Sequence, residues 1–151
     1  MYSNAFGIRQ NTKSEGGVIV IFLERLLKRQ SPTIFGDGNA TRNFIYIEDV
    51  IDANMNALYS GSNEVFNIGT GKATSIKELF YLMKEIMDVN IEVEYSNERD
   101  EDIRHSYFSI DKAKEKLKWI PKYTLEEGLY KTMNYYKELL TKEVTMKLPY
   151  V

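Results

Sequence analysis

An arginine placed between two apolar runs is the most informative chemical feature of this sequence. Residues 34–50 read IFGDGNATRNFIYIEDV, in which two β-rich runs are paired around a Gly-Asp-Gly turn and Arg42 stands just before the second run. A guanidinium fixed at the edge of a strand is suited to holding a phosphate. Because most surface arginines are solvated charges, the spacing alone favours a surface arginine paired with Glu48 or Asp49.

Three further segments carry candidate binding residues. The loop NERDEDIRH at residues 97–105 contains Arg99 and Asp102, which could bind a phosphate and accept from sugar or ribose hydroxyls. An arginine among so many acids is more typical of a solvated, self-compensating loop. Asn4 could donate its amide to a phosphate or cap a turn, and Phe35 could stack on a flat base or belong to the core.

Composition excludes several classes of function. The chain has 151 residues and is 43% hydrophobic, which predicts one globular domain. A net charge of −2 with scattered basic residues gives no reason to expect nucleic acid. With no cysteine and one histidine, the sequence excludes disulfides and thiolate or histidine-rich metal sites. No apolar run approaches the roughly 20 residues that cross a bilayer, and no signal-peptide pattern is seen. We expect a cytoplasmic protein without membrane contact.

The hydrophobic periods predict a mixed α/β fold of helices and short strands. Helices are expected at residues 19–28, about 48–59, 76–86, 111–118 and 125–140, and strands at 1–5, in the two runs of 34–47, at 64–68 and at 90–95. Capping boxes at Ser75/Glu78 and Thr124/Glu127 predict two of the helix starts. Residues 141–151 show no period, so we expect a domain over 1–140 and a loose tail over 141–151.

Two motifs of nucleotide-dependent redox enzymes are missing. A tyrosine followed by lysine four residues later can abstract a proton from a sugar hydroxyl, but none of the 11 tyrosines has that neighbour, and Tyr81 with Lys84 comes closest. Gly69-Thr70-Gly71 follows an expected strand, but Thr74 holds the position of the third glycine in a dinucleotide fingerprint. We interpret these glycines as a turn, and we expect neither catalytic residues nor a cofactor site in this chain.

The candidate residues fall in the order and spacing of one known family. The sequence from Tyr2 to about Leu140 resembles the C-terminal, substrate-binding portion of the NAD-dependent epimerase/dehydratase enzymes, which are extended short-chain dehydrogenase/reductases, and within them it is most like the UDP-glucose 4-epimerases. Five segments carry the resemblance: YSNAFGIRQ, GGVIVIFLERLLKRQSPTIFGDG, TRNFIYIEDV, VFNIGTGKATSIKEL and RDEDIRHSYFSIDKAKEKLKWIP.

The resemblance implies that seven residues bind a UDP-sugar: Asn4, Val18, Thr33, Phe35, Arg42, Arg99 and Asp102. Asn4, Arg42 and Arg99 would contact the diphosphate, and Asp102 would accept from ribose or sugar hydroxyls. Val18 and Thr33 would lie near the nucleotide, and Phe35 beside its base. Two departures from the family pattern bear on this site: Asn43 replaces an aspartate, and Glu101 replaces a glycine.

The resemblance also implies that a Rossmann half, with its NAD loop and Tyr-x-x-x-Lys, precedes the region that matches this chain. We therefore expect the C-terminal part of the extended fold without most of its Rossmann sheet, and a truncated enzyme that binds no NAD and is inactive alone. Residues 65–68 would form an unpaired strand, so we expect a homo-oligomer or association with a missing Rossmann half.

The expected function is the nucleotide-sugar-binding portion of an NAD-dependent UDP-sugar 4-epimerase. The family resemblance implies that the parent enzyme oxidises the sugar at C4 and returns the hydride to the other face. Two alternatives stay open: a fragment of a nucleotide-sugar dehydratase or decarboxylase, and a non-enzymatic module for nucleotide-sugar binding or assembly. The departures at Asn43 and Glu101 favour the second alternative.

Overall fold

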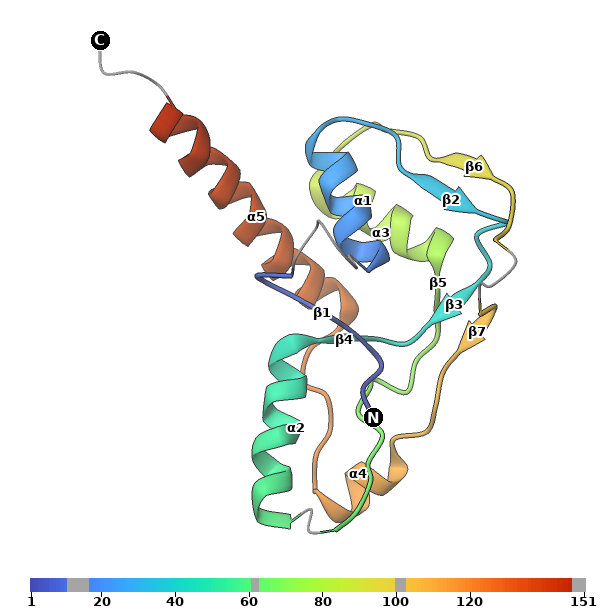
Figure 1. The fold of residues 1–151 in the computed structure, drawn as a ribbon, viewed down its shortest axis with the longest axis vertical. Helices are drawn as coiled ribbons and strands as arrows, with labels where there is room; N and C mark the ends of the chain where they lie inside the picture. The colour runs from blue at the N-terminus through green and yellow to red at the C-terminus, as the bar shows by residue number, and fades with distance from the viewer. Residues whose placement is uncertain (11–16, 61–62, 100–102, 148–151) are drawn as a thin grey trace.

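The computed structural model describes residues 1–10, 17–60, 63–99 and 103–147, with side chains as far as residue 141. It confirms a mixed α/β fold with short strands (Figure 1). The elements in chain order are β1 Asn4–Phe6, α1 Val18–Leu27, β2 Thr33–Phe35, β3 Thr41–Arg42, β4 Phe44–Tyr46, α2 Ile47–Ser60, β5 Thr74–Ser75, α3 Ile76–Met87, β6 Glu94–Ser96, β7 His105–Ser106, α4 Asp111–Lys116 and α5 Leu125–Lys147.

The strands pair with distant partners and not around the Gly-Asp-Gly turn. Strand β2 pairs in parallel with β6, β1 pairs in parallel with β4, and β3 lies between β5 and β7. The predicted pairing of the two runs within 34–47 is therefore wrong. Gly36 and Gly38 have φ of 72° and 76°, a backbone conformation that favours glycine, and the turn they form connects β2 to β3 in a different sheet.

The segment 64–68 is not the unpaired strand that the sequence predicts. Only Ile68 is bridged, in parallel, to Tyr2. The Ser3 N–H donates to the Ile68 carbonyl at 2.9 Å, and the Ile68 N–H donates to the Met1 carbonyl at 2.8 Å. One edge of this segment is thus covered by the chain's own first residues.

The helices form where the periods predict them, with one extension. Both capping boxes are present: Ser75 with Glu78 at the start of α3, and Thr124 with Glu127 at the start of α5. The backbone of α5 stays helical to Lys147, past the expected boundary at residue 140, and the helix projects from the rest of the fold (Figure 1). Residues 148–151 lie outside the described part of the chain, and the division at 140 stays a prediction.

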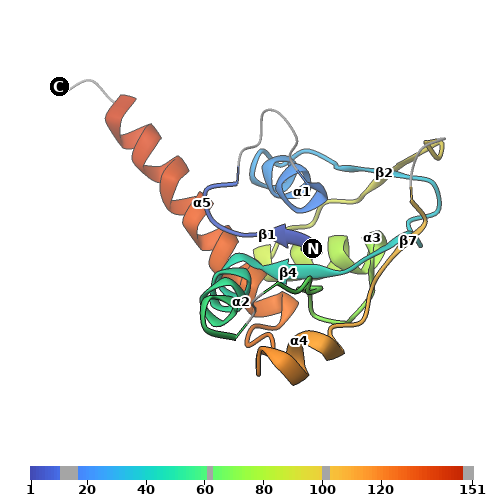
Figure 2. The ribbon, with the colours of Figure 1, turned by 60° about the horizontal axis from the view of Figure 1, so that its bottom comes forward.

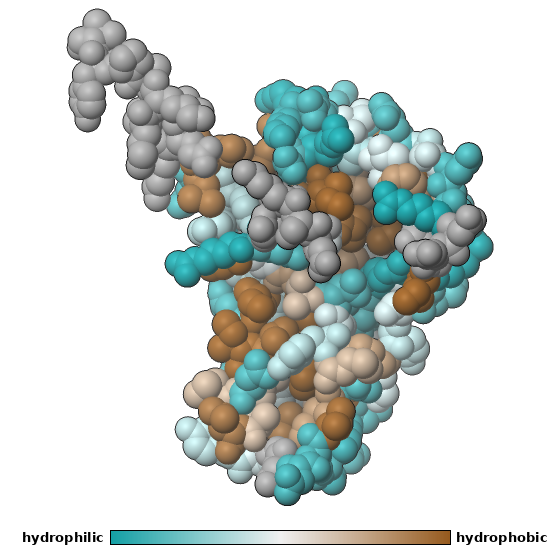
Figure 3. Space-filling model, viewed as in Figure 1, coloured by the Kyte–Doolittle hydropathy of each residue, from teal (hydrophilic) through white to brown (hydrophobic). Residues whose placement is uncertain are grey.

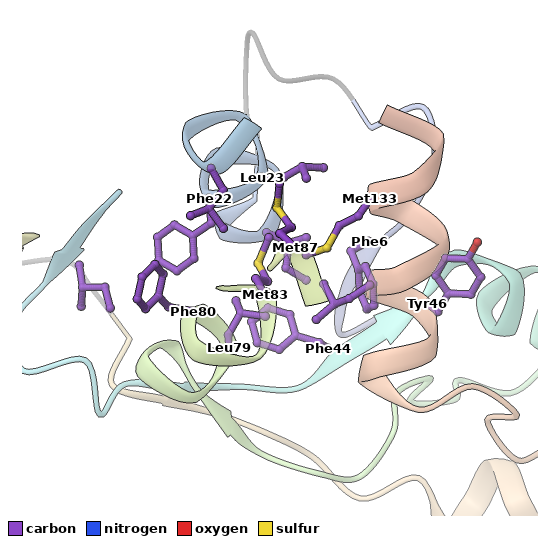
Figure 4. Close-up of a cluster of buried hydrophobic side chains, with 14 residues drawn as sticks. Phe6, Phe22, Leu23, Phe44, Tyr46, Leu79, Phe80, Met83, Met87 and Met133 are labelled. Atoms are coloured by element: carbon purple, nitrogen blue, oxygen red, sulfur yellow. The ribbon is translucent and has the colours of Figure 1, made fainter. Parts of the chain in front are cut away.

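Strand β4 separates two hydrophobic clusters. Because successive side chains of a strand point to opposite faces, Phe44 and Tyr46 join the cluster of α1, α3 and α5, while Ile45 joins the cluster of α2, α4 and Trp119. In the first cluster the Phe22 and Phe80 rings meet edge to face at 6.0 Å (Figure 4). Figure 2 shows β1 and β4 lying between α1 on one side and α2 and α4 on the other. This packing fixes the strand that follows Arg42.

Candidate functional site

A pocket of about 460 Å³ lies between α1, β2 and β3. Six of the seven predicted binding residues line it: Asn4, Val18, Thr33, Phe35, Arg42 and Arg99. They come from five segments of the chain that the fold brings together: β1, α1, β2, β3 and the residues after β6. The seventh, Asp102, lies outside the described residues.

Arg42 is held by its neighbours and not by a carboxylate. Its strand is paired on both sides, with Thr74 of β5 and Ser106 of β7 in register with Arg42. Its Nη1 donates to the Thr41 carbonyl at 2.9 Å and to the Ile103 carbonyl. Among the described residues no ion pair is formed by Arg42, so its positive charge is available to a ligand in the pocket.

The two acids that were alternative partners of Arg42 are engaged elsewhere. Asp49 is buried, and its carboxylate accepts from the backbone N–H groups of Lys122 at 2.8 Å and Tyr123 at 3.2 Å. Glu48 accepts from the Tyr123 hydroxyl at 2.5 Å and from Lys131 Nζ at 3.3 Å. The interpretation of Arg42 as a surface arginine paired with Glu48 or Asp49 is therefore wrong.

Tyr123 and Lys131 form a tyrosine–lysine contact that no local motif predicts. The Nζ of Lys131 lies 3.2 Å from the Tyr123 hydroxyl, and both groups meet the Glu48 carboxylate. The hydrogen bond from Tyr123, followed by that from Lys131, lowers the pKa of Glu48. Neither residue lines the pocket of Arg42, and the hydrogen bonds of Lys131 and Tyr123 with Glu48 tie α5 and the segment before it to α2.

Arg99 and Phe35 lie against each other at the pocket wall. The guanidinium carbon of Arg99 is 3.6 Å from the centroid of the Phe35 ring, well inside the roughly 6 Å range of a cation–π contact. Phe35 is 36% exposed, so the core alternative for this ring is wrong. The contact exists because β2 and β6 pair with Phe35 opposite Ser96, which the sequence did not predict.

Arg25 is a pocket residue that the sequence analysis missed. It lies on the face of α1 that also carries Val18 and Ile21, and its Nη1 donates to Gln30 Oε1 at 3.1 Å. The signal was its helical spacing from Val18, since residues seven apart share a helix face. Three arginines and no carboxylate line the described part of the pocket, an arrangement suited to an anionic ligand.

The Gly69-Thr70-Gly71 segment is a turn tied to the buried Asn43. The backbone N–H and the hydroxyl of Thr70 both donate to Asn43 Oδ1 at 3.0 Å, and Gly71 has φ of 68°. Because the Thr70 N–H is already bonded to a side chain, this turn does not offer the free amides that cradle a dinucleotide phosphate. The residues present do not fit an NAD site here.

Comparison with known proteins decides the family. The family model described as GDP-mannose 4,6 dehydratase matches residues 1–132. The chain belongs to this family. The family comprises NAD-dependent epimerases and dehydratases of the extended short-chain dehydrogenase type, as the resemblance implied.

Several members of the epimerase/dehydratase family are similar along most of this chain. The UDP-glucose 4-epimerase of Mycolicibacterium smegmatis is 37% identical over 136 residues, which are 89% of this chain and 44% of the relative. The UDP-glucuronic acid decarboxylase 1 of Arabidopsis thaliana is 28% identical over 140 residues, 93% of this chain and 32% of the relative. The chain thus spans less than half the length of these curated relatives.

Two solved family members have the same fold over the region that this chain matches. The UDP-glucose 4-epimerase of Thermotoga maritima, crystallised with UDP-glucose, matches with a TM-score of 0.89 and 47% identity over 92% of this chain and 45% of that protein. The UDP-glucose 4-epimerase of Thermus thermophilus, solved in complex with NAD, matches with a TM-score of 0.82 and 31% identity over 90% and 45% of the two chains.

Of the helices described here, none is both long and apolar enough to cross a bilayer.

Proposed function

We propose that this chain forms the nucleotide-sugar-binding part of an NAD-dependent UDP-sugar 4-epimerase. The observation that carries the proposal is the assembly of Asn4, Phe35, Arg42 and Arg99 in one pocket with no described carboxylate. Relatives named as UDP-glucose 4-epimerases, and one solved with UDP-glucose, support the choice of ligand.

The pocket's residues would bind and orient the substrate without taking part in proton or hydride transfer. Arg42 and Arg99 would neutralise the diphosphate, and Asn4 would donate its amide to the same group. Val18 and Thr33 would line the nucleotide side, with Asp102 contributing to ribose or sugar hydroxyls. NAD and the catalytic pair of such an enzyme would belong to a part of the fold outside these residues, so we predict no turnover by this chain alone.

Calorimetric titration with UDP-glucose, UDP-galactose and GDP-mannose tests the proposal, with NAD as a negative control. We expect a UDP-sugar to bind and NAD not to bind. Arg42→Ala should weaken UDP-sugar affinity by about 10- to 100-fold, the loss of one charge-assisted contact.

Arg104→Ala is the matched control, because Arg104 forms an exposed ion pair with Asp37 and does not line the pocket. It should leave affinity unchanged. Equal losses in the two variants would indicate a general charge effect, and no effect of Arg42→Ala would favour a non-enzymatic structural module. Turnover by the purified chain would contradict the assignment of binding alone.

We also propose that an apolar face on α2 packs against a second protein surface. Its side chains recur at helical spacing and are exposed by 54%, 49%, 74% and 83%: Ile51, Met55, Leu58 and Tyr59. Figure 3 shows apolar residues gathered over this part of the molecule. The partner is either the portion of the fold that relatives have and this chain does not match, or a second copy. A cytoplasmic location remains a prediction.

A further inference from the structure

The contact between Phe35 and Arg99 changes what each residue can do in the pocket. With its guanidinium carbon 3.6 Å from the ring centroid, Arg99 covers one face of Phe35. A base cannot stack on that face while the arginine occupies it. The separate roles of Phe35 beside a base and Arg99 on a phosphate therefore have to be considered together.

Stacking leaves the hydrogen-bonding edge of Arg99 free. The five N–H donors of a guanidinium lie in its plane, whereas the contact with an aromatic face uses the direction perpendicular to that plane. An arginine that rests on a ring can thus donate sideways at the same time. Both residues line the pocket, as does Arg42.

The position of Arg99 on its segment explains why it needs such support. It follows β6, whose last residue, Ser96, accepts from the Gly36 N–H at 2.9 Å. Three residues after Ser96, the side chain of Arg99 is exposed. The carboxylate of its sequence neighbour Glu98 could compete with an anionic ligand for the guanidinium. In the described part of the chain, Arg99 forms no ion pair, and its described contact is with Phe35.

We propose that Phe35 is a positioning residue for Arg99: its ring fixes the guanidinium plane so that the N–H edge meets the anionic group of the ligand. The inference rests on the proposed function, because it takes the ligand to be a nucleotide diphosphate. It assigns Phe35 to the phosphate-binding machinery through Arg99, in place of a direct contact with the base.

A double-mutant cycle in the full 151-residue chain tests this, with UDP and inorganic pyrophosphate as calorimetric probes. Phe35→Leu should weaken pyrophosphate and UDP by the same factor, about three- to tenfold. Arg99→Ala should weaken both by about 10- to 100-fold. The double variant should bind no worse than Arg99→Ala, because Phe35 then has no arginine to position. Phe35→Tyr keeps the ring face and should bind within about twofold of the parent chain.

Two results would overturn the inference while leaving the proposed function intact. If Phe35→Leu weakens UDP but not pyrophosphate, the ring acts on the base. If the losses from Phe35→Leu and Arg99→Ala multiply in the double variant, the two residues act independently. Failure of the unsubstituted chain to bind either probe would refute the proposed function, and the inference with it. Thermal unfolding followed by the buried Trp119 checks that each variant is folded.

Discussion

Asn43 binds Thr70 twice: its Oδ1 accepts the Thr70 backbone N–H and the Thr70 hydroxyl, each at 3.0 Å. Asn43 is 1% exposed and lies between Arg42 and strand β4. A side chain at the neighbouring Gly69 would place its Cβ 2.9 Å from the same oxygen. The turn and the strand edge that carries Arg42 are therefore joined at one atom, and the asparagine that departs from the family pattern serves as the acceptor.

Replacing Asn43 should destabilise the fold. Asn43→Ala leaves both Thr70 donors without their acceptor in a partly buried site, at a cost of about 1–3 kcal/mol in the free energy of unfolding. Urea denaturation monitored by Trp119 fluorescence measures it. Asn97→Ala, at an exposed position, should change the same quantity by less than about 0.5 kcal/mol. Equal stability of the two variants would show that the Asn43 bonds contribute nothing net.

Gly128 in α5 should resist a substitution that normally stabilises helices. Alanine is favoured over glycine in a helix by about 1 kcal/mol. Here an added Cβ would lie 2.8 Å from Phe6 Cζ and 3.0 Å from Tyr46 Cβ, so overpacking of about 1–3 kcal/mol should exceed that gain. We expect Gly128→Ala to lower the melting temperature, whereas Lys137→Ala at an exposed site of the same helix should not. A higher melting temperature for Gly128→Ala would mean that α5 can shift away from β4.

The contact of Glu48 with Tyr123 and Lys131 should make the free energy of unfolding depend on pH in the acid range. The hydrogen bond from Tyr123, with that from Lys131, lowers the pKa of Glu48 in the folded chain. The unfolded chain therefore binds the proton more readily, so the contribution of Glu48 to stability is present at neutral pH and is lost as the pH falls below about 4.3.

Glu48→Gln should remove that dependence. At pH 7 we expect a loss of about 0.5–1 kcal/mol, a small value because the side chain is 42% exposed and its ion pair is screened. The difference from the parent chain should shrink towards pH 3, as measured by urea denaturation at several pH values. Glu126→Gln, at an exposed position of α5, is the control. A difference that stays constant with pH would indicate a packing effect instead.

The apolar face of α2 should drive association. Sedimentation velocity of the chain over a concentration series should show species larger than the monomer, since contiguous exposed apolar side chains mark contact surfaces. Leu58→Glu combined with Tyr59→Ser should shift the chain towards monomer. Tyr130→Ser should not, because Tyr130 is an exposed aromatic residue on a different helix, α5. A monomer at every concentration would exclude the second copy and leave the unmatched portion of the relatives' fold as the partner.

Local patterns were sufficient for the helices, whereas the candidate pocket residues came from the family resemblance. The helix α1 follows from apolar residues at a period of 3.6, and α3 begins where Ser75 and Glu78 can cap each other. Six of the residues inferred from motif resemblance line one pocket, because a motif keeps its order and spacing when the fold is kept. Arg25 was missed because its only signal was its helical spacing from Val18, and that spacing does not show that the shared helix face borders a cavity.

Partner choice was decided only by the tertiary structure. Runs of two or three residues form too few hydrogen bonds to select a partner by themselves, so the packing of α1 against α3, and not the Gly-Asp-Gly turn, pairs β2 with β6. The same holds for Phe35 with Arg99 and for Glu48 with Tyr123 and Lys131. The sequence by itself identified Arg42 and Arg99 as side chains that could bind an anion, and the tertiary structure added Arg25. Their orientation depends on contacts between segments far apart in the chain. Those segments are brought together by the burial of the whole core, because no single local preference offsets the entropy of closing such long loops.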